Sequence, residues 1–91
     1  MDLGIKDKRA LVSGSTKGIG YASARALAAE GAAVVLNGRS AAGVDAAVHR
    51  LRAEWPQAEV SGIAADLGTA AGCEALFAQL PAVDILVNNL G

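Results

Sequence analysis

The part of the sequence with the clearest potential for chemistry is a glycine-rich turn. It reads Gly14-Ser15-Thr16-Lys17-Gly18-Ile19-Gly20 and directly follows a short β-rich run at residues 9–13. Glycine permits backbone angles that a side chain forbids, and it lets the chain approach a pyrophosphate closely. A turn that opens a helix also presents unpaired N–H groups at the positive end of the helix dipole. The turn is therefore a candidate phosphate-binding loop.

Two other interpretations of this turn stay open. It can be a tight turn without a ligand, because glycine is common wherever a strand turns sharply into a helix. The phosphate loop of nucleotide hydrolases is the second alternative, and that loop ends in Gly-Lys-Ser/Thr. Here Lys17 precedes Gly18 and no Ser or Thr follows in the required place, so the hydrolase pattern is not met.

The elements that must position the turn follow from the apolar periodicity. β-Rich runs lie at residues 9–13, 34–36, 60–64 and 83–87, and helices are predicted at 19–30, between Ser40 and Pro56, and between Thr69 and Pro81. Ser40 and Thr69 are candidate N-caps, and Gly31 stands where a helix C-terminus accepts a positive φ. This β-α-β-α-β-α-β order predicts a parallel sheet with right-handed crossovers.

The same periodicity predicts which residues are buried. Val34–Leu36 is a continuous apolar run, which is typical of a strand covered on both faces. The second helix carries one apolar stripe, formed by Val44, Ala47, Val48, Leu51 and Trp55. The third helix is expected to bury Leu76, Phe77 and Leu80. No helix follows the run at 83–87, so we expect it to form an apolar edge of the sheet.

Charge and cysteine content exclude several classes of function. Eight basic and nine acidic side chains give a net charge of −1, whereas binding to nucleic acid needs a basic excess. No stretch reaches the roughly 18 consecutive apolar residues of a membrane span, and charges stand where a signal peptide has its apolar part. The lone Cys73 and the lone His49 predict neither a disulfide nor a metal site. We expect a soluble, cytoplasmic protein.

The size of the chain bears on its domain organisation. Of its 91 residues 53% are hydrophobic, but 21 are alanine, which buries little area per residue. A chain this short hides only roughly 60% of the surface that its unfolded form exposes. Together with the apolar edge, this leads us to expect that residues 1–91 are the N-terminal portion of one larger domain.

The glycine spacing, G-x-x-x-G-x-G, differs from the common dinucleotide fingerprint and resembles that of the short-chain dehydrogenase/reductase family. Three further segments agree in order and separation: Asn37-Gly38-Arg39-Ser40, Asp66-Leu67 and Asn88-Asn89-Leu90-Gly91. The family usually has alanine where this chain has Leu90. The resemblance runs from about Leu3 to Gly91, and four motifs in register make it specific.

The resemblance implies a Rossmann-like, doubly wound α/β fold, of which this chain supplies the first βαβαβαβ part. It places the glycine-rich turn over the cofactor phosphates and ribose, Asp66 and the Leu67 backbone at the adenine, and the last motif at the adenosine side. The implied cofactor-binding residues are Gly14, Ser15, Thr16, Lys17, Gly18, Ile19, Gly20, Asn37, Arg39, Ser40, Asp66, Leu67, Asn88, Asn89 and Gly91. For Asp66, a role as a turn or capping residue remains the alternative.

The residues after the second run indicate which dinucleotide is preferred. A fold that prefers NAD places an acid there to hold the ribose 2′-hydroxyl. This chain has the uncharged Asn37 and Gly38, followed by Arg39, whose guanidinium suits a 2′-phosphate. Lys17 can add a second positive charge. NADP(H) is thus favoured, and the alternative for Arg39 is a solvated cation at a helix start, where it opposes the helix dipole.

The implied activity is hydride transfer between NADP(H) and a small-molecule carbonyl or alcohol, in a homo-oligomer that is a dimer or tetramer. The family's catalytic serine, tyrosine and lysine have no counterpart here, because Tyr21 is followed four residues later by Arg25 inside the cofactor helix. No catalytic residue is therefore predicted in this chain, which by itself is expected not to turn over substrate. A non-catalytic nucleotide-binding module, acting as a sensor or partner subunit, is the alternative.

Overall fold

The computed structural model describes residues 7–16, 18–79 and 83–87, which form alternating strands and helices. In chain order these are β1 (Arg9–Val12), α1 (Gly18–Ala29), β2 (Ala33–Gly38), α2 (Ala41–Glu54), β3 (Val60–Ala64), α3 (Ala70–Gln79) and β4 (Ile85–Val87). The strands pair in parallel in the order β3-β2-β1-β4. The predicted element order and the parallel sheet are therefore confirmed. No helix in the described ranges is long and apolar enough to cross a membrane.

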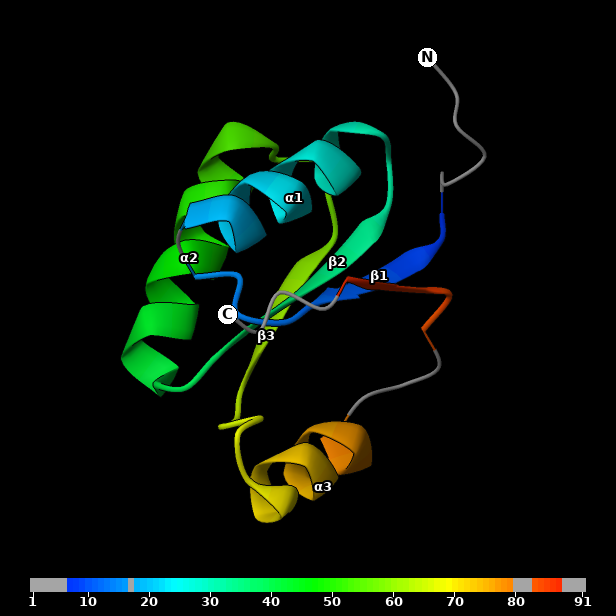
Figure 1. Cartoon of the computed structure of the whole chain (residues 1–91). Coiled ribbons are helices and arrows are strands. Elements are labelled where there is room, and N and C mark those ends of the chain that lie inside the picture. Colours follow the sequence, from blue (N-terminus) through cyan, green and yellow to red (C-terminus); the bar gives the residue numbers. More distant parts are fainter. Residues whose placement is uncertain (1–6, 17, 80–82, 88–91) are drawn as a thin grey trace.

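Helices cover both faces of the sheet (Figure 1), with α1 and α2 on one face and α3 on the other. The α1/α2 cluster comprises Val12, Tyr21, Ala24, Ala28, Ala32, Val34, Leu36, Val44, Ala47, Val48, Leu51 and Val60. The α3 cluster comprises Leu11, Val35, Ile63, Ala65 and Leu76. Neighbouring residues of β2 enter opposite clusters, which is the pattern expected for a strand covered on both faces. The doubly wound arrangement is thus present.

Strand β2 is longer than the apolar run predicted. It continues through Asn37 and Gly38, which pair with Ile63 and Ala64 of β3. Asparagine and glycine are poor strand formers, so the local sequence does not indicate this extension. Pairing with β3 supplies the hydrogen bonds that hold both residues in the strand, and they are its last two residues instead of the start of a loop.

The predicted stripe of α2 is mostly correct. Val44, Ala47, Val48 and Leu51 are buried, and the Ser40 hydroxyl caps the helix by accepting a hydrogen bond from Gly43 N at 3.1 Å. Trp55 is instead 41% exposed, because the helix ends at Glu54 and the backbone turns away from helical angles at this residue. The helical periodicity therefore stops one residue before Trp55.

The predicted stripe of α3 is wrong at one position. Thr69 caps the helix as expected, with its hydroxyl accepting from Gly72 N at 2.9 Å, and Leu76 is buried. Phe77, however, is 64% exposed. Adjacent helix residues point about 100° apart, so a helix that turns Leu76 toward the sheet turns Phe77 away from it. Leu80 lies outside the described residues.

Strand β4 is shorter than the predicted run and lies beside β1. Its first expected residues form a bend in which the Asp84 carboxylate accepts a hydrogen bond from Arg9 N at 2.9 Å, and Asp84 N donates to Arg9 O at 2.8 Å. Leu86 is 62% exposed at this edge of the described sheet.

Tyr21 joins α1 to α2. Its ring is buried, with the Arg50 guanidinium 4.4 Å from the ring centre, and its hydroxyl has no hydrogen-bond partner within the described ranges. Burial, aided by the Glu54 carboxylate, raises the pKa of Tyr21 and outweighs the opposite effects of Arg50 and Arg25. The side chain therefore serves packing, which supports the interpretation that it is not the catalytic tyrosine.

We expect Tyr21→Phe to leave the free energy of unfolding unchanged or to raise it by up to about 1 kcal/mol, because it removes an unpaired buried hydroxyl and keeps the ring. A phenol whose folded-state pKa is raised stabilises the fold below the unfolded pKa and loses this contribution as the pH rises further. Urea unfolding should therefore show the wild type losing stability relative to the variant above about pH 10. A clear loss of stability in the variant at neutral pH would contradict an unpaired hydroxyl.

Candidate functional site

The glycine-rich turn leaves the carboxyl end of β1 and enters α1 in a conformation that requires glycine. Gly14 has φ 56° and Gly18 has φ 64°, both in the left-handed region that side chains rarely adopt. Gly20 is buried in the first turn of α1, Thr16 is half-buried, and Ile19 is exposed. Lys17 lies outside the described residues.

Ser15 fastens this turn to the sheet. Its side chain is fully buried, and its hydroxyl donates to Val12 O at 2.7 Å while accepting from Asn37 N at 2.8 Å. Ser15 N also donates to Asn37 O at 2.8 Å. The hydroxyl is thus occupied inside the protein, so Ser15 shapes the loop from behind.

Asn37 is buried behind the same loop and connects three segments. Its side-chain oxygen accepts from Gly14 N at 3.3 Å, and its side-chain nitrogen donates to Ile63 O at 3.1 Å and Ala65 O at 3.3 Å. One amide therefore ties the start of the glycine-rich turn to the end of β3. The sequence predicts Asn37 as a cofactor contact and does not predict this supporting contact. The available signal was a polar residue that directly continues the apolar run Val34–Leu36.

The segment after β2 places a positive charge at the start of a helix. Arg39 is exposed, and no carboxylate pairs with it among the residues that the structure describes. Ser40 follows it as the N-cap of α2, so the Ser40 hydroxyl is engaged with Gly43 N. Gly38, the residue before Arg39, is buried at the end of β2.

Asp66 follows β3 in an exposed turn. Its carboxylate oxygen Oδ1 accepts from Gly68 N at 2.9 Å, and its carbonyl accepts from Thr69 N at 3.2 Å. This is the turn role that the sequence left open for Asp66, and the exposed residue stays accessible to a ligand as well. Leu67 is half-buried and packs on the α3 cluster.

The glycine-rich turn, Arg39 and Asp66 all follow the carboxyl ends of adjacent parallel strands, so the fold brings them to one edge of the sheet. Asn88, Asn89 and Gly91 lie outside the described residues. The first turns of α1 and α2 contain no acidic residue. Their N-termini therefore keep the partial positive charge that attracts an anion. This edge can bind a phosphorylated ligand.

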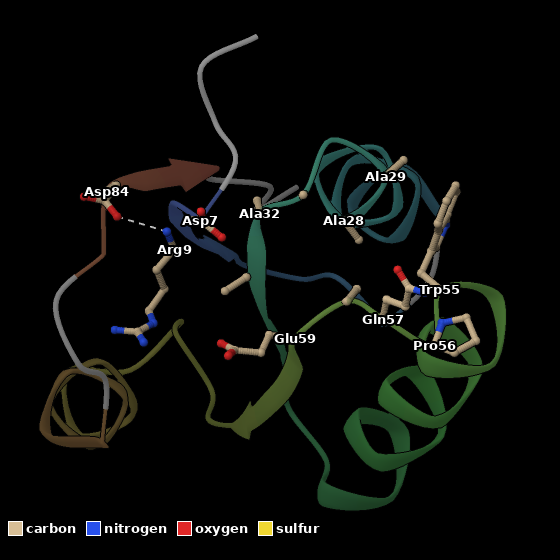
Figure 2. Close-up of a pocket in the computed structure, with 13 residues that line it drawn as sticks. Asp7, Arg9, Ala28, Ala29, Ala32, Trp55, Pro56, Gln57, Glu59 and Asp84 are labelled. Atoms are coloured by element: carbon tan, nitrogen blue, oxygen red, sulfur yellow. Dashed lines mark hydrogen bonds between the residues drawn. The ribbon is translucent and has the colours of Figure 1, made fainter. Parts of the chain in front are cut away.

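A hollow of about 930 Å³ lies at the opposite edge of the sheet, at the amino ends of the strands. Figure 2 shows Trp55 on one side of it and Arg9 and Asp84 on the other. Three carboxylates line this hollow, those of Asp7, Glu59 and Asp84, against the one guanidinium of Arg9. An acidic lining repels phosphates, and open α/β sheets bind their ligands at the carboxyl ends of the strands. Its size alone does not make it the candidate site.

We expect Asn37→Asp to lower the free energy of unfolding by about 2 to 4 kcal/mol, because it removes two donors and places a carboxylate against two carbonyl oxygens. Chemical denaturation at neutral pH measures the change. Gln57→Glu is the matched control, since it makes the same amide-to-acid change at an exposed position and should have little effect. The deficit should shrink at acid pH, where the new carboxyl regains a proton to donate. Equal effects of the two substitutions would contradict the supporting role of Asn37.

Comparison with known proteins agrees with this geometry. The chain is 50% identical over 91 residues to an uncharacterized oxidoreductase of Bacillus subtilis, YvaG, covering all of this chain and 34% of that protein. It is 40% identical over 85 residues to gluconate 5-dehydrogenase of Gluconobacter oxydans, covering 91% of this chain and 33% of the other. The chain thus spans about a third of the length of these relatives.

A solved structure is similar over the same extent. L-Sorbose reductase from Gluconobacter frateurii, complexed with NADPH and L-sorbose, matches with a TM-score of 0.89 at 37% identity, over 100% of this chain and 36% of that one. The family model for short chain dehydrogenases matches residues 8–91, which include the glycine-rich turn and all four strands. By this match and by its fold, the chain belongs to the short-chain dehydrogenase family.

Proposed function

We propose that this chain binds NADP(H) at the carboxyl edge of its sheet, as part of an oxidoreductase that transfers hydride between the nicotinamide and a carbonyl or alcohol substrate. The observation that carries the proposal is the exposed Arg39, which stands next to the uncharged Gly38 at the N-terminus of α2. In a dinucleotide fold this is where the adenosine ribose is held.

Arg39 suits a 2′-phosphate for two physical reasons. A guanidinium forms paired, charge-assisted hydrogen bonds with a phosphate, and the capped start of α2 adds a favourable partial charge. An NAD-selective site needs a carboxylate near the ribose, and neither Asn37 nor Gly38 provides one.

The remaining parts of the proposed site follow the same edge. The pyrophosphate is assigned to the turn between Gly14 and Gly20, where the first N–H groups of α1 have no partner inside the helix and can face an anion. The adenine is assigned to Asp66 and the Leu67 backbone. Lys17, Ser40, Asn88, Asn89 and Gly91 remain proposed contacts.

Hydride transfer to a carbonyl also needs a group that donates a proton to the developing alkoxide. The proposal assigns no residue of this chain to that step, and Tyr21 is unsuited to it because its hydroxyl is buried between helices. The substrate class is supported by the L-sorbose reductase complex, which contains NADPH and a sugar. A homo-oligomer and a cytoplasmic location complete the proposal.

We expect Arg39→Gln in the full-length protein to weaken NADPH binding by about 10- to 100-fold, the equivalent of one charge-assisted contact, while NADH binding changes little. Titration of each nucleotide, followed by its fluorescence, measures both dissociation constants. Arg50→Gln is the control, since it removes the same charge from a later turn of α2. Parallel losses for NADPH and NADH, or no loss at all, would refute 2′-phosphate recognition by Arg39.

A further inference from the structure

Gly38 is confined by side chains from two other elements. A Cβ atom added to Gly38 would overlap Cγ2 of Thr16, in the glycine-rich turn, and would lie 3.2 Å from Cγ2 of Val44, in α2. The backbone of Gly38 is in an ordinary strand conformation, so its lack of a side chain is a matter of space and not of backbone angles.

Neither neighbour can move away easily. Thr16 is β-branched and follows Ser15, which is fastened to Val12 and Asn37 by buried hydrogen bonds. Val44 is 2% exposed. Its other methyl group, Cγ1, packs against Gly62 of β3 and fills the space that a side chain at position 62 would need. A side chain at position 38 would therefore have to displace the loop or helix α2.

We propose that Thr16 is a residue that determines cofactor selectivity, because its methyl group occupies the space in which a carboxylate at position 38 would begin. The proposal rests on the proposed binding of NADP(H) at this edge. The acid that holds the ribose 2′-hydroxyl of NAD follows the glycine-rich turn by about 20 residues. Because the Asn37 side chain is turned into the protein and bonded to Ile63 O and Ala65 O, position 38 is the one of the two from which an acid would reach the ribose. Preference for NADP then depends on a pair of residues, Thr16 and Gly38, in addition to Arg39.

Because the Thr16 methyl group and position 38 compete for the same space, substitutions at the two positions should act together. An acid introduced at position 38 alone should fail to produce an NAD-selective protein, because overpacking disturbs the loop that holds the phosphates. Removing only the Thr16 methyl group should make room for it.

The test compares Gly38→Asp alone with the double variants Thr16→Ser/Gly38→Asp and Thr16→Val/Gly38→Asp in the full-length protein. Titration with NADPH and NADH should show Gly38→Asp weakened toward both nucleotides. Thr16→Ser/Gly38→Asp should shift the ratio of NADH to NADPH affinity toward NADH by about 10-fold or more relative to the wild type, the scale of one charged contact, with Arg39 still in place. Thr16→Val keeps a methyl group and loses the hydroxyl, so its double variant should bind like Gly38→Asp. The same shift toward NADH in Gly38→Asp alone, or in both double variants equally, would overturn the proposal.

A second measurement needs no cofactor. Gly38→Ala should lower Tm by about 5 °C or more in the wild-type background, and by less than half of that in the Thr16→Ser background. Equal drops in the two backgrounds would overturn the steric pair even if NADPH binds. If the drops differ but the wild-type protein binds neither nucleotide, the steric pair stands, and both the proposed function and the selectivity role are lost.

Discussion

The candidate site depends on a small group of buried hydrogen bonds behind the glycine-rich turn. Ser15 and Asn37 exchange hydrogen bonds with each other and with Val12, Gly14 and the end of β3. Hydrogen bonds of this kind are individually modest in water, but a buried partner left without its bond costs much more. The turn is therefore held to β1, β2 and β3 together, while Gly18 and Ile19 at the start of α1 are exposed. This arrangement separates the groups that hold the loop from the groups that can contact a phosphate.

Small residues bring the helices close enough for this edge to form. Alanines at positions 24 and 28 bury one side of α1 without bulk, and Gly38 and Gly62 receive the two methyl groups of Val44. The low aromatic and high alanine content thus serves close packing of helices on the sheet, as the interior of a protein requires. The consequence for function is steric, because the space that a side chain at position 38 would need is already filled. In the role proposed for Thr16, the same atoms set the packing and the ligand preference.

Much of the fold could be predicted because its signals are local. Alternating apolar runs and helical stripes predict the order of strands and helices, and caps such as Ser40 and Thr69 mark where helices begin. Gly31, with φ 91°, ends α1 as its position in the pattern indicates. Two errors concern helices: the apolar pattern continues through Phe77 and Trp55, but both side chains are exposed. A third concerns β2, which extends two residues beyond its apolar run because β3 pairs with it.

For the site, the sequence by itself determined which chemistry is present: a glycine-rich turn, an arginine and no acid at the end of β2, and an aspartate after β3. Only the tertiary structure decided that Asn37 faces the interior and supports Gly14, and that the Thr16 methyl meets Gly38. These contacts join residues 22 or 23 positions apart, and they form only because β1 and β2 lie side by side in the sheet. Residue type and spacing indicate which backbone conformations a segment can adopt. The space available to each side chain depends instead on how the helices and strands pack together.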